Sequence, residues 1–272
     1  AAQARAGELQ PWPEVSFRAT ATSNASQRAG RLKTAQAAQM LLFLLTMMLA
    51  GMVLSNLVEE KGNKIIEVLA AAVPMDSVFY GKLFAMLAVS LVGISVWGGV
   101  GALIYLGAGS AIPQLPTPAV GWPLLIGLGV TYFAMAYLLL GAVFLSIGSM
   151  ATTVREVQTL SMPVTMMQLM VFFLATFAMT QPGSAIELFS VVFPFSSPFA
   201  MLARAAQDPA LWPHGAALAW QVLCVAVLVR VGSALFRKRV MKSGPARPRK
   251  KGLRGRRKVR SADVAGQSAA GV

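Results

Sequence analysis

Long apolar stretches without charge divide most of the chain into membrane-spanning segments. Residues 34–58, 83–154 and 157–186 contain no charged side chain, and about 20 apolar residues are enough for one helix to cross a bilayer. The second stretch has room for two helices with a Gly- and Pro-rich turn at 108–121 between them. The third stretch supplies one span at about 163–180, and a further apolar segment at 212–236 supplies another, so the pattern predicts five spans. They are expected to be helices, since backbone polar groups in lipid must be satisfied within the segment.

The segment between the first two spans has a different, amphipathic pattern. Apolar residues recur at helical spacing on one side, and charged residues recur on the other. The apolar stripe consists of Ile65, Val68, Leu69, Ala72 and Val73, and the polar ridge consists of Glu60, Lys64 and Glu67. Pro74 should end this helix, and Asp76 is placed to cap the next one. The pattern predicts an interfacial helix over 59–73, either a plain connector or a docking element for a cytoplasmic partner.

The balance of residue types supports an integral membrane protein and locates its charge. Of the 272 residues, 56% are hydrophobic and 12% charged, about half the charged fraction of a soluble domain. The net charge is +14, and 13 of the 24 Lys and Arg residues lie between Arg237 and Arg260. This run contains no aromatic residue to stack on bases, so we expect it to attract membrane lipids and to bind no specific nucleic acid.

The basic run also predicts the orientation. Cytoplasmic loops are enriched in Lys and Arg, so the C-terminus should be cytoplasmic and the turn at 108–121 should lie outside. With five spans the N-terminal segment is then also outside, where Arg28, Arg31 and Lys33 are exceptions to the rule.

The segment after the first span resembles a known signature. "EEKGNKIIEVLAAAVPMDSVFYGKLFAM" is similar to the signature segment of the type-two ABC exporter permeases, particularly the NatB-like subgroup. The matching residues are Glu59, Glu60, Lys61, Asn63, Glu67, Pro74, Gly81 and Lys82. Gly62 and Lys64 depart from the family pattern, where Glu and Arg are more usual. Two later stretches agree as well: "ATTVREVQTLSMP" resembles the second cytoplasmic loop, ending in Pro before a helix, and "FPFSSPFAMLARAAQ" resembles an outer segment that re-enters the membrane.

The resemblance implies an architecture and a set of domains. It implies an all-α integral membrane protein of about five transmembrane helices, with an interfacial coupling helix and a short re-entrant outer segment. Family members usually have six spans and a sizeable outer domain, so the chain is expected to be truncated at its N-terminus. Residues 1–36 would be an extramembrane remnant of that domain, 37–236 the transmembrane permease domain, and 237–272 a basic, disordered cytoplasmic tail.

The resemblance also implies partners and contact residues. The chain would be the permease of an ATP-driven exporter in a bacterial plasma (inner) membrane, pairing with an ATP-binding cassette subunit and with a second permease copy or a homologue. The expected contacts to the ATP-binding subunit are Glu59, Glu60, Lys61, Asn63, Lys64 and Glu67, with Arg155 and Glu156 as a secondary contact. No Gly-x-x-x-x-Gly-Lys-Ser/Thr loop occurs in the sequence. The chain is therefore expected to hold no cofactor and to leave ATP and Mg²⁺ to its partner.

Small and polar residues within the spans suggest how the helices pack. Gly93, Gly98, Gly99 and Gly101 allow close backbone approach, and packing within this chain is favoured over a dimer face. Gln168 and Gln221 should form hydrogen bonds between helices, with a place on the substrate path as the alternative.

Rival functions are an intramembrane enzyme, a scaffold protein and a channel. The paired Glu59 and Glu60 faintly resemble the motif of membrane-embedded CAAX-type proteases, but that chemistry needs several histidines. The only histidine, His214, is expected to be structural. A non-transporting scaffold that holds lipids with its basic tail is the main alternative, and a channel would need a filter loop or rings of carboxylates. The sequence does not select a cargo among ions, drugs and lipids.

Overall fold

The computed structural model describes residues 20–62, 73–108, 115–151 and 153–240, and within them the chain is helical without strands. The helices are α1 (Thr20–Gly62), α3 (Met75–Ala108), α4 (Trp122–Met150), α5 (Val154–Met179), α6 (Ala185–Val192), α7 (Ser197–Gln207) and α8 (Trp212–Val240). Five of these, α1, α3, α4, α5 and α8, are long and apolar enough to cross a membrane. The prediction of an all-α integral membrane protein with five spans is therefore confirmed.

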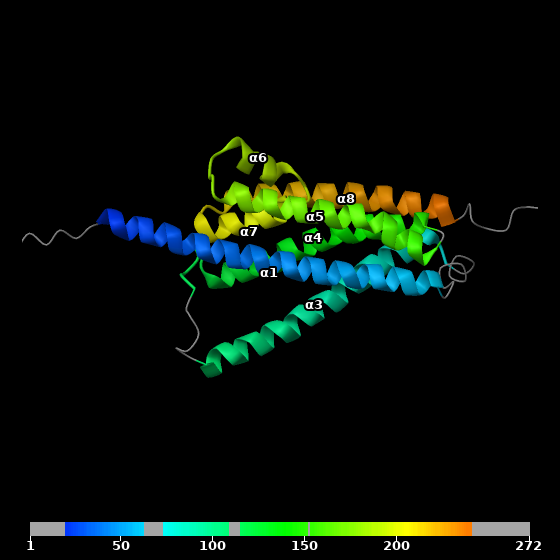
Figure 1. Cartoon of the computed structure of the whole chain (residues 1–272), viewed down its shortest axis with the longest axis horizontal. Helices are drawn as coiled ribbons and strands as arrows, with labels where there is room; N and C mark the ends of the chain where they lie inside the picture. The colour runs from blue at the N-terminus through cyan, green and yellow to red at the C-terminus, as the bar shows by residue number, and fades with distance from the viewer. Residues whose placement is uncertain (1–19, 63–72, 109–114, 152, 241–272) are drawn as a thin grey trace, which may run out of the picture.

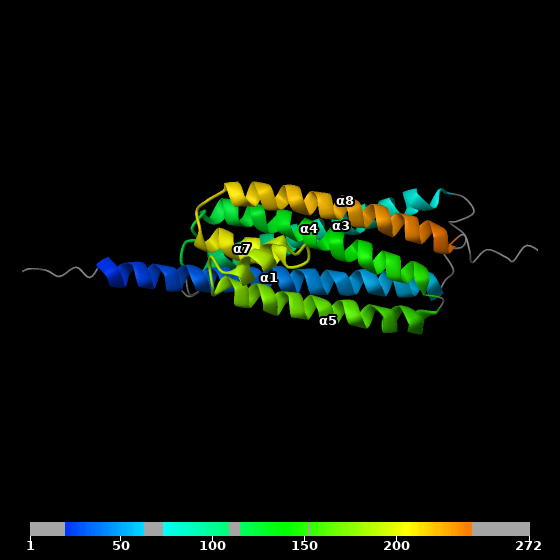
Figure 2. The ribbon, with the colours of Figure 1, turned by 90° about the horizontal axis from the view of Figure 1, so that it is seen from above.

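The five long helices lie roughly side by side around α4 (Figures 1 and 2). α4 is the most buried span and packs against α1, α3, α5 and α8. At one end of the bundle α1, α4 and α8 finish and α3 and α5 begin, and we call it the Gly62 end. At the other, α4 and α8 begin and α3 and α5 finish, and we call it the Trp122 end.

Two helix starts differ from the expected ones for local reasons. α5 begins at Val154, nine residues before Pro163, because the Thr153 hydroxyl accepts a hydrogen bond from the Glu156 amide at 3.2 Å and caps the helix. Likewise α3 begins at Met75, so Asp76 lies in its first turn instead of capping it. The amide of Val78 bonds to the Pro74 carbonyl at 3.2 Å.

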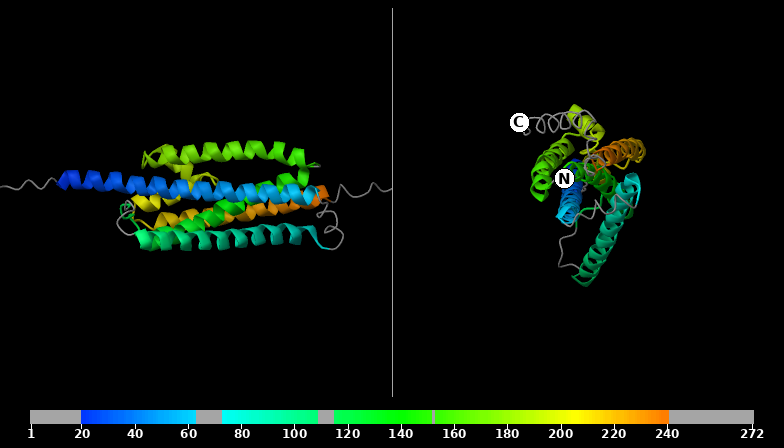
Figure 3. Two further views of the ribbon diagram at one scale, coloured as in Figure 1. Left: turned by 60° about the horizontal axis from the view of Figure 1, so that its bottom comes forward. Right: turned by 90° about the vertical axis from the view of Figure 1, so that its right-hand side faces the viewer.

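α3 packs against the bundle along only part of its length. Phe79, Leu83 and Ser90 are buried, whereas almost every residue from Val92 to Gly107 is exposed. In Figures 1 and 3 its second half diverges from the other helices. A Cβ atom added at Gly93, Gly98, Gly99 or Gly101 would meet nothing within 4 Å in the described chain. The expectation that these four glycines serve packing within this chain was wrong.

The segment between α5 and α8 re-enters the bundle as expected. Nine of the eleven residues of α7 are buried, and α7 contacts α1, α4, α5 and α8 at the Trp122 end. Phe199 is fully buried and packs edge-on against Phe43 of α1 and Phe172 of α5, at ring distances of 6.2 and 6.4 Å. A short helix held by neighbours on all sides can sit at membrane depth without exposing its ends to lipid.

Three glycines permit the closest helix crossings near the Gly62 end. A Cβ atom at Gly141 would lie 2.7 Å from Leu83, and one at Gly148 would lie 2.9 Å from Leu57. At Gly232 it would lie 2.7 Å from the Ser146 hydroxyl and 2.9 Å from the Phe79 ring. Small residues thus bring α1, α3 and α8 against α4, as is typical of membrane helices.

Candidate functional site: the Gly62 end

The predicted partner-contact residues gather at the Gly62 end where they fall within the described chain. Glu59, Glu60 and Lys61 form the last turn of α1, which continues to Gly62 without a break. The interfacial helix predicted from Glu59 therefore does not begin there, because the first span itself extends through these residues. Asn63, Lys64 and Glu67 lie outside the described residues, so their role as contacts stays a prediction.

The two neighbouring glutamates of this turn differ in their surroundings. The Glu60 carboxylate accepts a hydrogen bond and forms an ion pair with the Lys82 ammonium, which projects from the second turn of α3. These side chains are only 26% and 15% exposed. Glu59 is exposed. Glu60 thus holds α3 against α1, while Glu59 faces the surroundings of the bundle.

A second ion pair ties α3 to α8. Arg237 Nη1 donates to Asp76 Oδ2 at 2.7 Å. Below it, the rings of Phe79 and Phe236 meet edge-on at 5.7 Å, and both are buried. The charged pair is half-exposed and contributes little alone, since exposed ion pairs contribute about 0–1 kcal/mol. The buried aromatic contact fixes the first turn of α3 to the end of α8.

The Glu60–Lys82 and Asp76–Arg237 pairs involve residues on either side, in the sequence, of the segment predicted to bind the ATP-binding subunit. α1 ends at Gly62 and α3 begins at Met75. The end of α1 is joined to α3 by Glu60–Lys82, and the start of α3 is joined to α8 by Asp76–Arg237. A force applied to the chain between Gly62 and Met75 would therefore act on α1, α3 and α8 together.

The secondary contact pair lies at the same end of the molecule. Arg155 and Glu156 are in the first turn of α5, and the Arg155 side chain is exposed. Figure 1 places this turn at the same end as the end of α1 and the start of α3. The described residues of the two predicted contact groups therefore lie at the same end of the bundle.

Both predicted intramembrane glutamines are buried. Gln168 of α5 is 2% exposed and Gln221 of α8 is fully buried. Neither the nitrogen nor the oxygen of the Gln221 amide has a hydrogen-bond partner in the described chain. The expected interhelical bond of Gln221 is thus absent among the described residues, and the roles of Gln168 and Gln221 stay predictions.

Replacing Gln221 by Met tests whether the buried amide lacks hydrogen-bond partners. A buried amide without partners costs about 1–3 kcal/mol, so Gln221→Met, which keeps the volume, should leave the melting temperature unchanged or raise it. Thermal unfolding of the purified protein measures this, with Gln36→Met at an exposed position of α1 as the control. A drop of several degrees confined to Gln221→Met would show that the amide is satisfied.

His214 is built into the bundle, in agreement with a structural role. The side chain is 3% exposed, and its Nδ1 lies 2.8 Å from the Tyr132 hydroxyl of α4. The contact joins the third turn of α4 to the first turn of α8.

The ion pairs of Lys82, Asp76 and Arg237 were not predicted from the sequence. Lys82, Asp76 and Arg237 were noted as a motif residue, a cap and part of a basic tail, but each carries a link between spans. The available signal was their position within two turns of a span end, where an ionisable side chain needs a partner or access to the interface.

Comparison with known proteins identifies the family. The sequence profile described as "ABC-2 family transporter protein" matches residues 5–234. The chain is 25% identical to Uncharacterized protein MJ1024 of Methanocaldococcus jannaschii over 166 residues, 61% of this chain and 39% of the relative. It is 24% identical to Uncharacterized protein YhaP of Bacillus subtilis over 204 residues, 70% of this chain and 47% of the relative.

The chain thus spans less than half the length of these two relatives. No solved structure matches it significantly. Because the family profile covers nearly all of the described bundle, the chain belongs to the ABC-2 family of transporter proteins, the membrane-spanning components of ABC transporters.

Proposed function

We propose that this chain is a permease subunit that couples ATP hydrolysis by a separate subunit to export of a substrate. Family membership supports a permease, and members of this family normally work with an ATP-binding cassette subunit. The site of coupling in this proposal is the Gly62 end, with the segment 63–72 as the docking element. The observation that carries it is the pair of links, Glu60–Lys82 and Asp76–Arg237, on either side of that segment.

The proposed mechanism is a rigid-body movement. Closure of the ATP-binding subunits would push on the segment between α1 and α3, and packed helices transmit such a push as a tilt or shift. α3 is well placed to move, since it contacts the bundle mainly through its first half. Within the described residues its second half makes few contacts with the bundle, so a change in its angle would break few of them.

The proposed orientation places the Gly62 end in the cytoplasm. The segment from Arg237 to Arg260 carries 13 of the 24 Lys and Arg residues, and a basic segment beside a span favours the cytoplasmic side. The same orientation puts α6, α7 and the turn before Trp122 on the outer side. An ATP-binding subunit could then reach Glu59 and Arg155, which are exposed at the cytoplasmic end.

Charge reversal on the docking segment tests this function. Glu67→Lys should reduce copurification with the ATP-binding subunit by about tenfold, because a charge-assisted contact would be replaced by repulsion. Glu60 is a poor choice for this purpose since it is engaged by Lys82. The measurement is pull-down of the subunit encoded with this chain, together with its ATP turnover in proteoliposomes.

The matched control is removal of residues 241–272, which leaves α8 intact. A permease should keep permease-stimulated ATP turnover without this tail, whereas a lipid-binding scaffold should lose its role. If Glu67→Lys leaves copurification and ATP turnover unchanged, the segment 63–72 is not the docking element.

A further inference from the structure

A cleft of about 550 Å³ opens at the Trp122 end, far from the proposed coupling site. It lies between the first half of α1, the end of α5, the turn that follows α5, and α7. Its volume falls in the usual range of small-ligand sites, about 300–1,000 Å³. The wall is amphipathic: Leu32, Met179 and Ala200 supply apolar surface, and charged side chains supply the rest.

Three guanidinium groups and two carboxylates line the cleft. Arg28 and Arg31 come from α1, Arg204 from α7, Glu187 from α6, and Asp208 follows α7. The formal balance of these groups is one net positive charge, three against two. A ligand can use only those charged groups that do not already form ion pairs within the protein.

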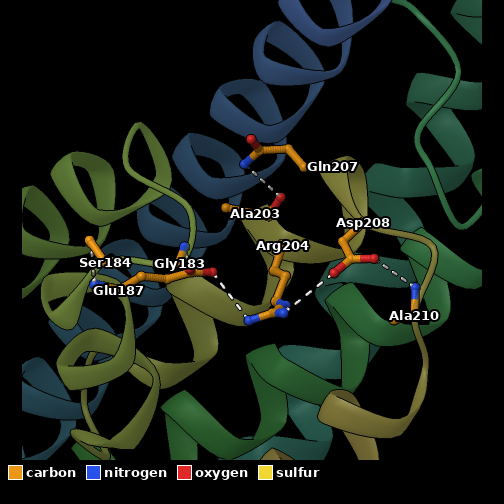
Figure 4. A network of polar contacts seen from close by, with 8 residues as sticks. All are labelled: Gly183, Ser184, Glu187, Ala203, Arg204, Gln207, Asp208 and Ala210. Atoms are coloured by element: carbon orange, nitrogen blue, oxygen red, sulfur yellow. Dashed lines mark hydrogen bonds and ion pairs between the residues drawn. The ribbon is translucent and has the colours of Figure 1, made fainter.

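Both carboxylates are fully engaged, as Figure 4 shows. Arg204 donates from Nη1 to Glu187 Oε1 at 3.2 Å and from Nη2 to Asp208 Oδ2 at 3.4 Å. The second oxygen of Glu187 accepts from the Gly183 amide, and that of Asp208 accepts from the Ala210 amide at 3.0 Å. Each of the four carboxylate oxygens therefore has a donor, and Arg204 is held rigidly between the two acids.

Arg28 and Arg31 have no counter-charge from the part of the chain that the structure describes. Among the described residues, neither guanidinium has a carboxylate oxygen within 4.0 Å. The two residues are three apart on α1 and so share one face of that helix. The cleft thus presents a pair of cations beside two carboxylates that are already bonded to Arg204 and to backbone amides.

The fold fixes where this pair points. Thr34 donates its hydroxyl to the Pro116 carbonyl at 2.7 Å, and a Cβ atom at Gly30 would lie 2.9 Å from the Pro116 ring. The Ala119 amide then bonds to the Ala206 carbonyl of α7 at 2.9 Å. The turn before α4 therefore holds both α1 and α7, and it sets the rotation of α1 that brings Arg28 and Arg31 to the cleft.

The depth of the cleft indicates the kind of ligand. Trp122 and Trp212 are exposed at the same end of the bundle, 38% and 78% respectively, and tryptophan concentrates at the level of lipid headgroups. Paired arginines recognise phosphate through several charge-assisted hydrogen bonds. An apolar wall beside them suits a hydrocarbon chain.

From these observations we infer that the cleft binds the phosphate headgroup of an anionic amphiphile, with Arg28 and Arg31 on the phosphate and its chain along Leu32, Met179 and Ala200. This inference concerns binding and stands apart from ATP coupling at the other end of the molecule. The same chemistry would be offered by an outer-leaflet phospholipid or by a free phosphate compound. The amphipathic wall favours the lipid.

A cysteine reporter in the cleft can measure occupancy. Ala29→Cys in a Cys224→Ala background places one thiol on the cleft wall. Thr117→Cys, exposed in the turn and outside the cleft, is the matched control. The rate of maleimide labelling of the protein in detergent is followed with added dioctanoyl phosphatidylglycerol, dioctanoyl phosphatidylcholine or inorganic phosphate.

Phosphatidylglycerol is expected to slow labelling at position 29 at least fivefold and to leave position 117 unchanged. Zwitterionic phosphatidylcholine should protect much less. Arg28→Gln combined with Arg31→Gln should raise the lipid concentration for half-protection about tenfold. The charge-preserving pair Arg28→Lys and Arg31→Lys should retain most of the protection, which separates loss of charge from loss of fold.

The results distinguish a phospholipid ligand from a free phosphate compound, and two of them would contradict the inference. Protection by inorganic phosphate alone would mean a free-anion site and would overturn the amphiphile. Equal protection by both lipids, unaffected by the Gln pair, would mean an ordinary lipid-facing groove and would overturn the site. Neither result depends on an ATP-binding subunit, so failure here leaves the proposed function untouched.

Discussion

Glu60→Lys should lower both the thermal stability of the bundle and permease-stimulated ATP turnover. The substitution sets two ammonium groups side by side where Lys82 is only 15% exposed. Loss of a half-buried ion pair should cost about 1–3 kcal/mol, between the values for exposed and buried pairs. We expect a fall in melting temperature of several degrees and a loss of stimulated turnover of tenfold or more.

The reciprocal change separates an internal link from a partner contact. Combining Glu60→Lys with Lys82→Glu restores opposite charges across the same two helices and should recover most of the stability. Glu59→Lys is the matched control, since that side chain is exposed one residue away and should leave the melting temperature unchanged. If the double variant is no more stable than Glu60→Lys, the Glu60–Lys82 pair does not hold α1 to α3.

Gly232→Val should cause the largest loss of stability. Its Cβ atom would lie 2.7 Å from the Ser146 hydroxyl and 2.9 Å from the buried Phe79 ring, with the Ala142 carbonyl at 3.4 Å. Overpacking of this kind costs about 1–3 kcal/mol. α8 would have to move away from α4 and from the first turn of α3, which would also strain the Asp76–Arg237 pair.

The control for Gly232→Val is Gly93→Val on α3, where an added Cβ meets nothing within 4 Å. Thermal unfolding of the purified protein should show a drop for the first variant only. Gly232→Ala should be partly rescued by Ser146→Ala, because that change removes the nearest of the three contacts. A stable Gly232→Val protein would mean that the crossing of α4 and α8 is looser than the structure has it.

The spans could be predicted from the sequence because charge is excluded from lipid over a length that the bilayer sets. That rule predicts the five helices and the observed starts of α4 and α8, whereas α1, α3 and α5 begin well before the predicted spans. It fails at the charged ends, where α1 continues through Glu59 to Gly62 and α5 begins before Pro163. There the boundary is decided by local capping and by links between helices, and neither has a strong periodic signal.

The candidate sites were predictable to different degrees. The resemblance to exporter permeases points to Glu59 and Glu60 together, but burial separates an exposed residue from one engaged by Lys82. The Arg204–Asp208 pair is local, four residues apart at the end of α7, whereas the Arg204–Glu187 pair was not predictable, since it joins α7 to α6, which meet only in the folded bundle. Pairings over such distances depend on tertiary structure.

The most direct test of the account is the side of the membrane from which residue 63 can be reached. Asn63→Cys in the Cys224→Ala background should react with a membrane-impermeant maleimide in inside-out vesicles and be shielded once the ATP-binding subunit is added. In intact cells it should stay unlabelled, while Thr117→Cys should react. Labelling of residue 63 in intact cells would place the Gly62 end outside and contradict a cytoplasmic docking site for an ATP-driven partner.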